Sequence, residues 1–372
     1  MRKIILATVA VLSLAVFFLN CGGSSNNIVH PPQGSSAAVA FLQQQPNSFL
    51  LYPVLGKFSG SQFTTSMVKD PSTGNYVSAA IGSIFLSSKG DKATFEVFGG
   101  TDNANPTYQW DIYVGTIDGA NLVQVTNDAN NDEVPQFNPS ATKVIFSSYR
   151  SDTWFTVIRN ADGTGEQVLP NPANSYGTWH ASYSPDGTKI AVEAWGTNEQ
   201  GIFDGIFMMN ADGSNATMLT NGYAAGCWCQ DEMPVFTSDG THIVFSRASI
   251  ALVNQTPQVV QEDVYIMKAD GTSVTRLSNG VGVNFDPAVV YDATLQADRV
   301  LFGSNRDKLS VGSAGYELYS ISTTGTNVTR LTNNSLYDGF SIAEYDPTEV
   351  TAAARVRHEP RTPVPVERRL QW

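Results

Sequence analysis

Short apolar runs joined by Asp-Gly turns recur through this chain about every fifty residues, and this repeat limits what the chain can fold into. In the clearest copy, Asp186-Gly187 links two apolar runs and Asp212-Gly213 follows a third. Asp tolerates the left-handed backbone and Gly has no Cβ to clash, so Asp-Gly between apolar runs is a strong hairpin signal. The repeat therefore predicts a β structure built from one unit used several times.

Six copies align on a large residue that ends the first run of each unit. These residues are Leu86, Phe137, Tyr183, Phe236, Tyr291 and Tyr345. Five copies continue with a second run, a third run, a second turn and a short outer run. Four strands in about fifty residues is the pattern of a β-propeller blade. One blade cannot bury both of its faces, so the blades are expected to pack in a ring.

The two ends of the array predict how the ring closes. The sixth copy stops after its first strand, near 341–345, and three strand-like runs (38–42, 48–52 and 63–68) precede the first complete copy. Three N-terminal strands and one C-terminal inner strand would make a composite blade. We therefore expect an all-β, six-bladed propeller, with seven blades as the alternative. Closure by both ends also removes two edges that would otherwise promote aggregation.

The composition agrees with this fold class and limits the ligands. The chain of 372 residues holds 31 Gly and only 15% charged residues, as expected for an all-β protein rich in turns. Its formal charge is −12, and because the first three residues and the last 22 together contribute +5, the rest carries −17. A domain this acidic repels phosphate backbones, so we expect no nucleic-acid partner.

The start of the chain has the features of an export signal. Arg2 and Lys3 precede a sixteen-residue apolar run, 4–19, which is shorter than the roughly 20 residues that span a bilayer. The run ends at Cys21, and it resembles a bacterial lipoprotein signal in which the chain is cut before the Cys and the thiol is acylated. An ordinary signal peptide with a chance Cys is the alternative. We expect a signal peptide over 1–20, a lipidated Cys21 with a flexible tether over 21–36, and a propeller over 37–350.

The repeat units resemble those of TolB-type propellers, also described as WD40-like or PD40 repeats. The resemblance rests on Ser-Pro-Asp-Gly-Thr-Lys-Ile at 184–190, Asn-Ala-Asp-Gly at 210–213, Thr-Arg-Leu-Ser at 275–278 and Asn-Arg-Asp at 305–307. It covers roughly 79–347 and implies the propeller fold. The lipoprotein-type signal, in turn, implies an exported protein of the bacterial cell envelope, on the periplasmic or surface face of a membrane.

Candidate site residues fall in the segments that lead into the inner strands, because propeller ligands usually meet the channel or the loops at one end. They are Asp132, Glu133, Trp179, His180, Asp231, Glu232 and Asp286. One interpretation is structural, with the acids capping turns. The other is an acidic channel mouth that holds a cation or a basic surface, where the Trp179 indole stacks a sugar or a cation. His180 is a ligand or a hydrogen-bonded structural residue.

Two further segments lie outside the repeat. Cys227 and Cys229 flank Trp228, and in an oxidising compartment the pair could form a tight disulfide; two more ligands for zinc are not evident. The Arg- and Pro-rich tail, 351–372, is expected to be disordered. A basic contact arm and a segment foreign to the gene are alternatives for this tail.

These observations favour binding over catalysis. No Gly-x-Ser-x-Gly elbow and no phosphate-binding Gly loop occurs in the sequence. We expect a monomeric, exported, lipid-anchored propeller that binds an envelope protein or polymer, without a cofactor. The alternative is a propeller enzyme of the polysaccharide lyase or lactonase type, which would use Ca²⁺ or another divalent cation at the channel mouth.

Overall fold

The fold was taken from a computed structural model of the chain. It describes residues 38–44, 51–59, 62–67, 81–87, 92–98, 110–116, 122–223, 228–253, 256–279, 281–292, 295–307, 316–333 and 338–339. The predicted signal peptide, Cys21, the tether, Cys227 and the tail all lie outside these residues. Every element of the described part is a β-strand.

Five blades are each built from four consecutive strands in antiparallel order. The first is β4 (Ile81–Leu86), β5 (Lys92–Phe98), β6 (Trp110–Thr116) and β7 (Val123–Gln124); the second is β8 (Asn131–Phe137), β9 (Lys143–Arg150), β10 (Thr153–Asn160) and β11 (Gln167–Val168). The third is β12 (Ser175–Tyr183), β13 (Lys189–Asn198), β14 (Gly201–Asn210) and β15 (Thr217–Met218). The fourth is β16 (Cys229–Phe236), β17 (His242–Val253), β18 (Thr256–Lys268) and β19 (Thr275–Arg276). The fifth is β20 (Asn284–Asp292), β21 (Ala297–Ser304), β22 (Glu317–Ser322) and β23 (Thr329–Arg330).

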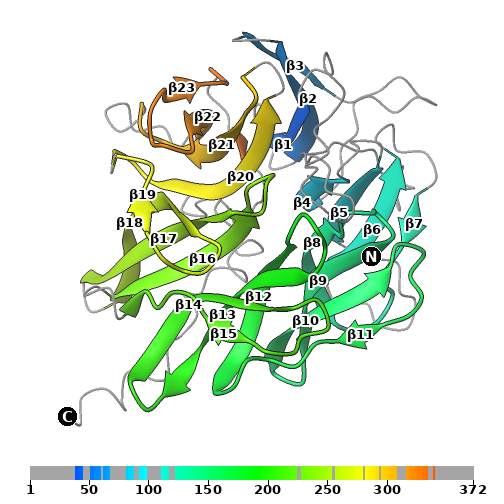
Figure 1. The fold of residues 1–372 in the computed structure, drawn as a ribbon. Helices are drawn as coiled ribbons and strands as arrows, with labels where there is room; N and C mark the ends of the chain where they lie inside the picture. The colour runs from blue at the N-terminus through cyan, green and yellow to red at the C-terminus, as the bar shows by residue number, and fades with distance from the viewer. Residues whose placement is uncertain are drawn as a thin grey trace, which may run out of the picture.

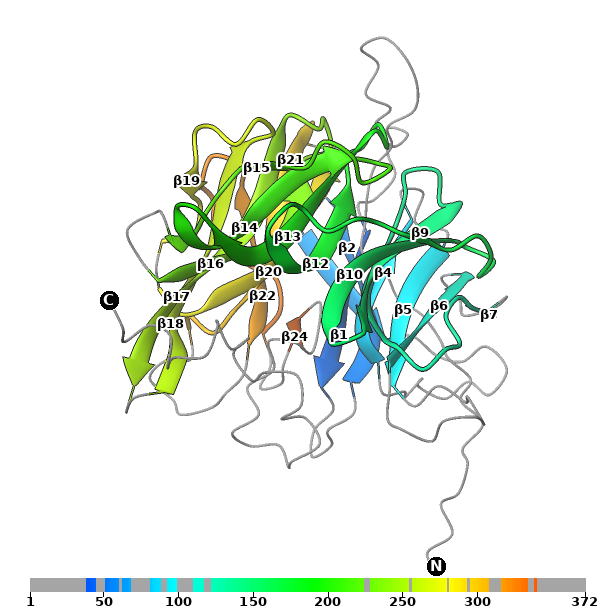
Figure 2. The same cartoon turned by 90° about the horizontal axis from the view of Figure 1, so that it is seen from below.

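A sixth four-stranded sheet joins the two ends of the chain. Its order is β24-β1-β2-β3, with β1 at Ala38–Gln44, β2 at Leu51–Ser59, β3 at Gln62–Met67 and β24 at Asp338–Gly339. Leu42 pairs with Gly339, and the Gln43 side-chain amide donates to Asp338 Oδ1 at 2.7 Å. Figure 2 shows β24 beside β1.

The sheets follow one another around a ring, with the first strand of each blade innermost (Figure 1). The inner strands run from one end of the ring to the other. We call the end where they begin the mouth end, and the end that carries the Asp-Gly turns the turn end. The β9–β10 hairpin, at Ser151 and Asp152, also lies at the mouth end, because β9 runs back from the turn end.

Two expectations about the ring are corrected. The complete blades number five, while the sheet expected as a sixth blade contains an inner strand of only two residues, and the described residues form no seventh sheet. The closing strand was expected near 341–345, which lie outside the described residues; the strand that pairs with β1 is Asp338–Gly339.

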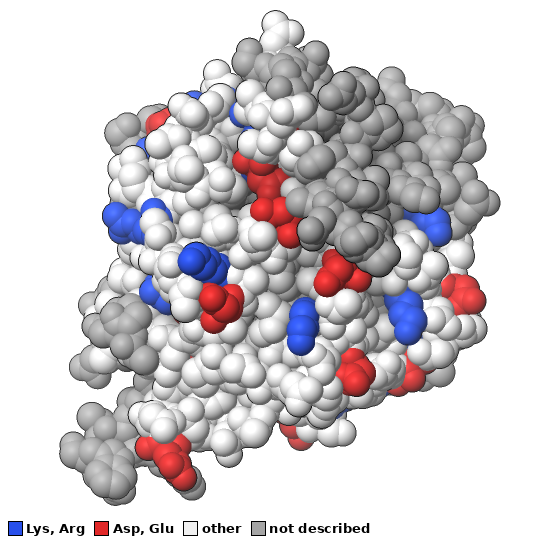
Figure 3. All heavy atoms as spheres, in the orientation of Figure 1, with Lys and Arg blue, Asp and Glu red and all other residues white. Residues whose placement is uncertain are grey.

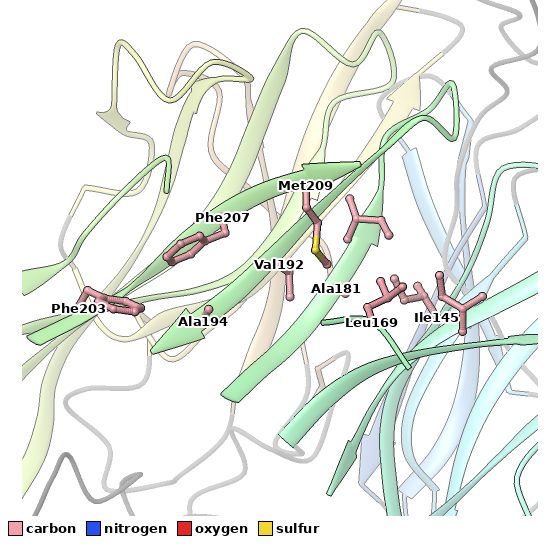
Figure 4. Packing of buried hydrophobic residues seen from close by; sticks show 10 residues of the cluster. Ile145, Leu169, Ala181, Val192, Ala194, Phe203, Phe207 and Met209 are labelled. Atoms are coloured by element: carbon pink, nitrogen blue, oxygen red, sulfur yellow. The ribbon is translucent and has the colours of Figure 1, made fainter. Parts of the chain in front are cut away.

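Apolar side chains between neighbouring blades form the core. One cluster joins Ile145, Ile158 and Leu169 of the second blade to side chains of the third, among them Val192 and Phe207 (Figure 4). Full burial of each such side chain contributes about 1.5–3 kcal/mol. Because every blade is sandwiched in this way, the repeat is stable only as a ring.

The inner strands carry a bulge that links one blade to the next. Val134, His180, Met233 and Asp286 occupy equivalent positions in four blades, and each has a positive φ between 42° and 57°. The Val134 N–H donates to Glu96 Oε2 of the preceding blade at 3.1 Å, and the His180 N–H donates to Ser147 Oγ at 3.2 Å. The unusual backbone thus aims an amide at the neighbouring blade.

The turn end repeats one hydrogen-bond pattern in the second, third and fourth blades. In all five described Asp-Gly turns, the Asp carboxylate accepts the N–H of the residue two positions on, at 2.9–3.0 Å. The pKa values of Asp162, Asp212 and Asp270 are lowered, chiefly by the hydroxyl hydrogen bonds of these turns. These acids therefore serve the architecture.

Candidate functional site

The seven candidate residues lie at the mouth end, but within the inner strands β8, β12, β16 and β20 rather than in the loops before them. They occupy three consecutive positions that recur from blade to blade. Five of them, Asp132, Glu133, His180, Asp231 and Asp286, are at most 6% exposed. The expectation of an open acidic mouth formed by loops is therefore wrong for these five, because the strands begin earlier than the turn signals indicated.

The first of the three positions holds Thr178 in the third blade and an acid or an amide, with a different partner each time, in the second, fourth and fifth blades and the composite sheet. Asp231 is paired with the Arg247 guanidinium on the adjacent strand, with Nη2 2.7 Å from Oδ2. Asn284 Oδ1 accepts from Arg306 Nη2 at 2.7 Å. Asp338 accepts from Gln43 in the composite sheet. Each of these oxygens is buried and satisfied, as buried polar groups usually are.

Asp132 differs from Asp231 although the two residues are equivalent. Its cross-strand partner is Ser148, where Asp231 faces Arg247. No described donor has hydrogen-bonding geometry to either carboxylate oxygen. Burial raises the pKa of Asp132 to about 7, and the nearby hydroxyls of Ser148 and Thr126 offset only part of that rise.

The arginine nearest to this carboxyl is held elsewhere. Arg150 donates to Glu166 through both terminal nitrogens, at 2.8 and 3.0 Å, and through Nε to Ser148 at 2.7 Å. The guanidinium pair lowers the pKa of Glu166 to about 2. Asp132 thus remains a buried carboxyl that titrates near neutral pH.

A second buried acid lies between the third and fourth blades. Asp204 of β14 accepts from Gln230 Nε2 at 2.8 Å. Burial, and after it the neighbouring charge of Glu232, raises the pKa of Asp204 well above its ordinary value. Sequence reasoning selected Glu232 but missed Asp204, which sits in the middle of an apolar strand and is far from Glu232 in sequence.

The remaining candidates fall at the bulge. His180 Nδ1 lies 3.8 Å from Glu193 Oε2, and both side chains are almost fully buried. Asp286 holds the equivalent position in the fifth blade, with a φ of 57°. These contacts agree with a structural role for the His180 side chain, in which a protonated ring would be paired with Glu193.

Trp179 belongs to an aromatic group that the sequence did not reveal. Its ring centroid lies 6.1 Å from Trp154 of β10 and 4.2 Å from His180. Trp154 lies 5.3 Å from Tyr149 of β9. Tyr149 and Trp154 are cross-strand partners next to a tight turn, and that pairing was the available signal.

The described residues include one of the two cysteines of the expected disulfide. Cys229 is disulfide-bonded, and its neighbour Cys227 lies outside the described residues. Among the described residues, no group of three or more His, Cys, Asp or Glu side chains is placed to hold a metal ion. A search of the same residues also finds no helix long and apolar enough to cross a membrane.

On the face seen in Figure 3, Lys and Arg side chains are scattered, and several Asp and Glu side chains adjoin one another near the upper centre. No broad basic surface is visible there.

No family model and no curated protein matches the sequence. Solved structures match the fold. A TolB-type protein from Agrobacterium tumefaciens is 16% identical, with a TM-score of 0.54, over 83% of this chain and 92% of that chain. A chain of a nidogen/laminin complex is 9% identical, with a TM-score of 0.54, over 81% of this chain and 97% of that one. At these identities the likeness concerns architecture. The chain therefore shares the β-propeller fold of these proteins.

Proposed function

We propose that this protein is an exported, lipid-anchored β-propeller that binds a protein or polymer of the bacterial cell envelope at its mouth end. The observation that supports it is the contrast between the two ends of the ring. At the turn end, the described Asp-Gly turns of the second, third and fourth blades repeat the same self-satisfied hydrogen bonds. At the mouth end, equivalent positions hold Asp132, Thr178, Asp231 and Asn284, each with different partners.

Departure from the repeat indicates function because the fold alone needs only the repeated contacts. Asp132 retains a buried carboxyl on the face of the second blade that carries Ser148, and the half-buried rings of Trp154 and Trp179 leave apolar surface at the same end of the ring. Natural sequences depart from local rules mainly at functional or strained sites. The composite sheet, which joins the two ends of the chain beside the five blades, is proposed to fix the geometry of this end.

The anchor at Cys21 and a location in the envelope rest on the sequence of the first 36 residues. The likeness to the TolB-type fold is compatible with such a location.

A pull-down from detergent-solubilised envelope tests the proposal. The bait is the mature chain, compared with a mouth-end variant, Trp179→Ala, and a turn-end variant, Asp212→Ala. We expect a stoichiometric partner that the mouth-end variant loses and the turn-end variant keeps. Retention by the first together with loss by the second would refute the assignment of the mouth end.

A further inference from the structure

We infer that Tyr149, Trp154 and Trp179 form a platform on which a neutral saccharide stacks. We call these three residues the aromatic platform. This inference deepens the proposed function, on which it rests, by naming the chemical class of the ligand at the mouth end. Three observations support it: the positions of the rings, the hydrogen bonds that hold the strands beneath them, and the charged and polar groups around them.

The three rings come from three strands and bridge two blades. Tyr149 ends β9, Trp154 begins β10, and Trp179 lies on β12 of the next blade. The ring centroids of Tyr149 and Trp154 lie 5.3 Å apart, with an interplanar angle of 56°. Those of Trp154 and Trp179 lie 6.1 Å apart, with an interplanar angle of 48°. The rings are therefore tilted against one another, so that together they form a continuous apolar surface rather than a closed stack.

These rings are not part of the core. Tyr149 is 41% exposed, and Trp154 and Trp179 are partly exposed. The apolar cluster between the same two blades is made of aliphatic side chains, Phe203, Phe207 and Met209, with Tyr183 and Met218 packed against it. Large aromatic side chains left at a surface provide apolar area without being needed for interior packing.

Hydrogen bonds beneath the platform fix its shape. Thr156 Oγ1 donates to Thr178 Oγ1 at 3.0 Å, and Thr178 Oγ1 donates to Asn171 Oδ1 at 3.0 Å. Asn171 Nδ2 in turn donates to the backbone carbonyl of Trp154 at 3.2 Å. Both threonines are 1% exposed. The second and third blades are thus joined directly under the rings, and a preorganised surface loses little entropy when a ligand binds.

The electrostatics favour a neutral ligand. Tyr149 and Arg150 are consecutive on one strand, so their side chains point to opposite faces of the blade. The Arg150 guanidinium is occupied by Glu166 on the opposite face. Among the described residues, the Arg150 guanidinium is therefore directed away from the rings, and His180 beside Trp179 lies next to Glu193. The acidic propeller also repels a phosphate or a uronate.

Polar groups suited to sugar hydroxyls adjoin the same face. Asn131 is the cross-strand neighbour of Tyr149, and its amide donates to Glu133. An aromatic face carries negative charge and attracts polarised C–H groups, which the flat face of a pyranose presents. The partly exposed Asn131 amide can exchange hydrogen bonds with its equatorial hydroxyls. This combination suits a saccharide better than a purely apolar ligand.

Tryptophan fluorescence and calorimetry with neutral tetrasaccharides test the inference. The probes are the tetramers of β-1,4-glucose, α-1,4-glucose and β-1,4-N-acetylglucosamine. We expect at least one to bind, with about tenfold weaker binding for Trp154→Ala and for Trp179→Ala. Trp154→Phe, which keeps a ring, should bind within about threefold of the parent. Added salt should leave the affinity unchanged because the ligand is neutral.

Tyr176→Ala is the matched control, because Tyr176 is an exposed aromatic residue of β12, the strand that also holds Trp179. The Tyr176 hydroxyl is hydrogen-bonded to Thr197 rather than packed on the platform. The variant should bind like the parent. Absence of binding for all three probes, or binding that both tryptophan variants preserve, would overturn the inference. Ring-dependent binding of a quaternary ammonium probe in place of the sugars would overturn it in favour of a cation site. An envelope partner that the parent captures and Trp179→Ala loses, without binding of any of the three sugars, would leave the proposed binding role standing without the saccharide.

Discussion

At the scale of single residues, two equivalent aspartates show how one position acquires different properties. Asp231 is compensated by Arg247, which also lies 4.9 Å from the Tyr265 ring centroid. Asp132 faces Ser148 and has a pKa raised to about 7. Both were candidates from the sequence, but their difference depends on the residue across the strand pair. The register of the strand pair determines which residue lies opposite each aspartate, and register cannot be predicted reliably from the sequence.

The raised pKa of Asp132 predicts a pH dependence of stability. The folded protein keeps the proton up to about pH 7, while the unfolded chain loses it near pH 4, so stability falls as pH rises through that window. The slope is about 1.4 kcal/mol per pH unit at most. Asp132→Asn should remove this dependence and raise the free energy of unfolding at pH 8 relative to the parent. Urea unfolding at pH 5 and pH 8 measures both.

Asp231→Asn provides the matched comparison. It leaves Arg247 buried beside a neutral group, and breaking a buried pair costs about 3–5 kcal/mol. We expect this variant to be destabilised at both pH values. If the two asparagine variants behave alike, the distinction drawn between these positions is wrong.

At the scale of elements, the Asp-Gly turns are interlocking parts as well as connections. Gly213 has a φ of 87°, and a Cβ there would lie 2.6 Å from Pro170 of the second blade. Gly187 has a φ of 71°, but its nearest neighbour, Pro139, would be 3.5 Å away. Both glycines satisfy the left-handed backbone of a turn, and only Gly213 is also packed against the adjacent blade.

Alanine substitutions separate these two contributions. Gly187→Ala should cost about 1–2 kcal/mol from backbone strain alone. Gly213→Ala should cost more, because the proline ring must move as well. Chemical denaturation of the two variants measures the difference. Equal costs would show that the contact between blades is not tight.

Elements were the part of the fold that sequence reasoning predicted best. Five units of four strands appear where the apolar runs and Asp-Gly turns placed them. The expected N-terminal strands at 38–42 and 63–68 correspond to Ala38–Gln44 and Gln62–Met67. The inner-strand starts were misjudged as loops, because Asp132 and Asp231 look like turn residues when read locally. Their burial depends on neighbouring blades, which no local pattern describes.

At the scale of the whole molecule, closure rests on a small strand. In the described C-terminal part of the chain, only Asp338 and Gly339 pair with β1. Leu42 of β1, which lies opposite Gly339, is fully buried. A chain ending at 337 exposes this edge of β1. A chain ending at 350 keeps the closing strand and removes the Arg-rich tail.

We expect the shorter chain to unfold at a lower temperature, by about 5–10 °C, given the loss of Leu42 burial and the Gln43 hydrogen bond. It should also associate through the freed strand edge. The chain ending at 350 should resemble the parent. Scanning calorimetry with light scattering makes the comparison, and an unchanged midpoint for the chain ending at 337 would show that β24 does not close the ring.

The anchor makes a prediction at the same scale. Cys21→Ser should release the protein from membranes into the soluble fraction, because an acyl chain on this thiol is the proposed attachment. Fractionation of cells that express the variant and the parent tests it. Continued membrane attachment of the variant would count against lipidation at Cys21.

Hydrogen exchange with and without an envelope extract tests the central claim, that ligands bind at the mouth end, most directly. Binding there should slow exchange in peptides covering 127–134, 147–155 and 172–180. Peptides of the turn end, at 184–188, 210–214 and 237–241, should exchange as they do in the free protein. Protection confined to the turn-end peptides would contradict the account.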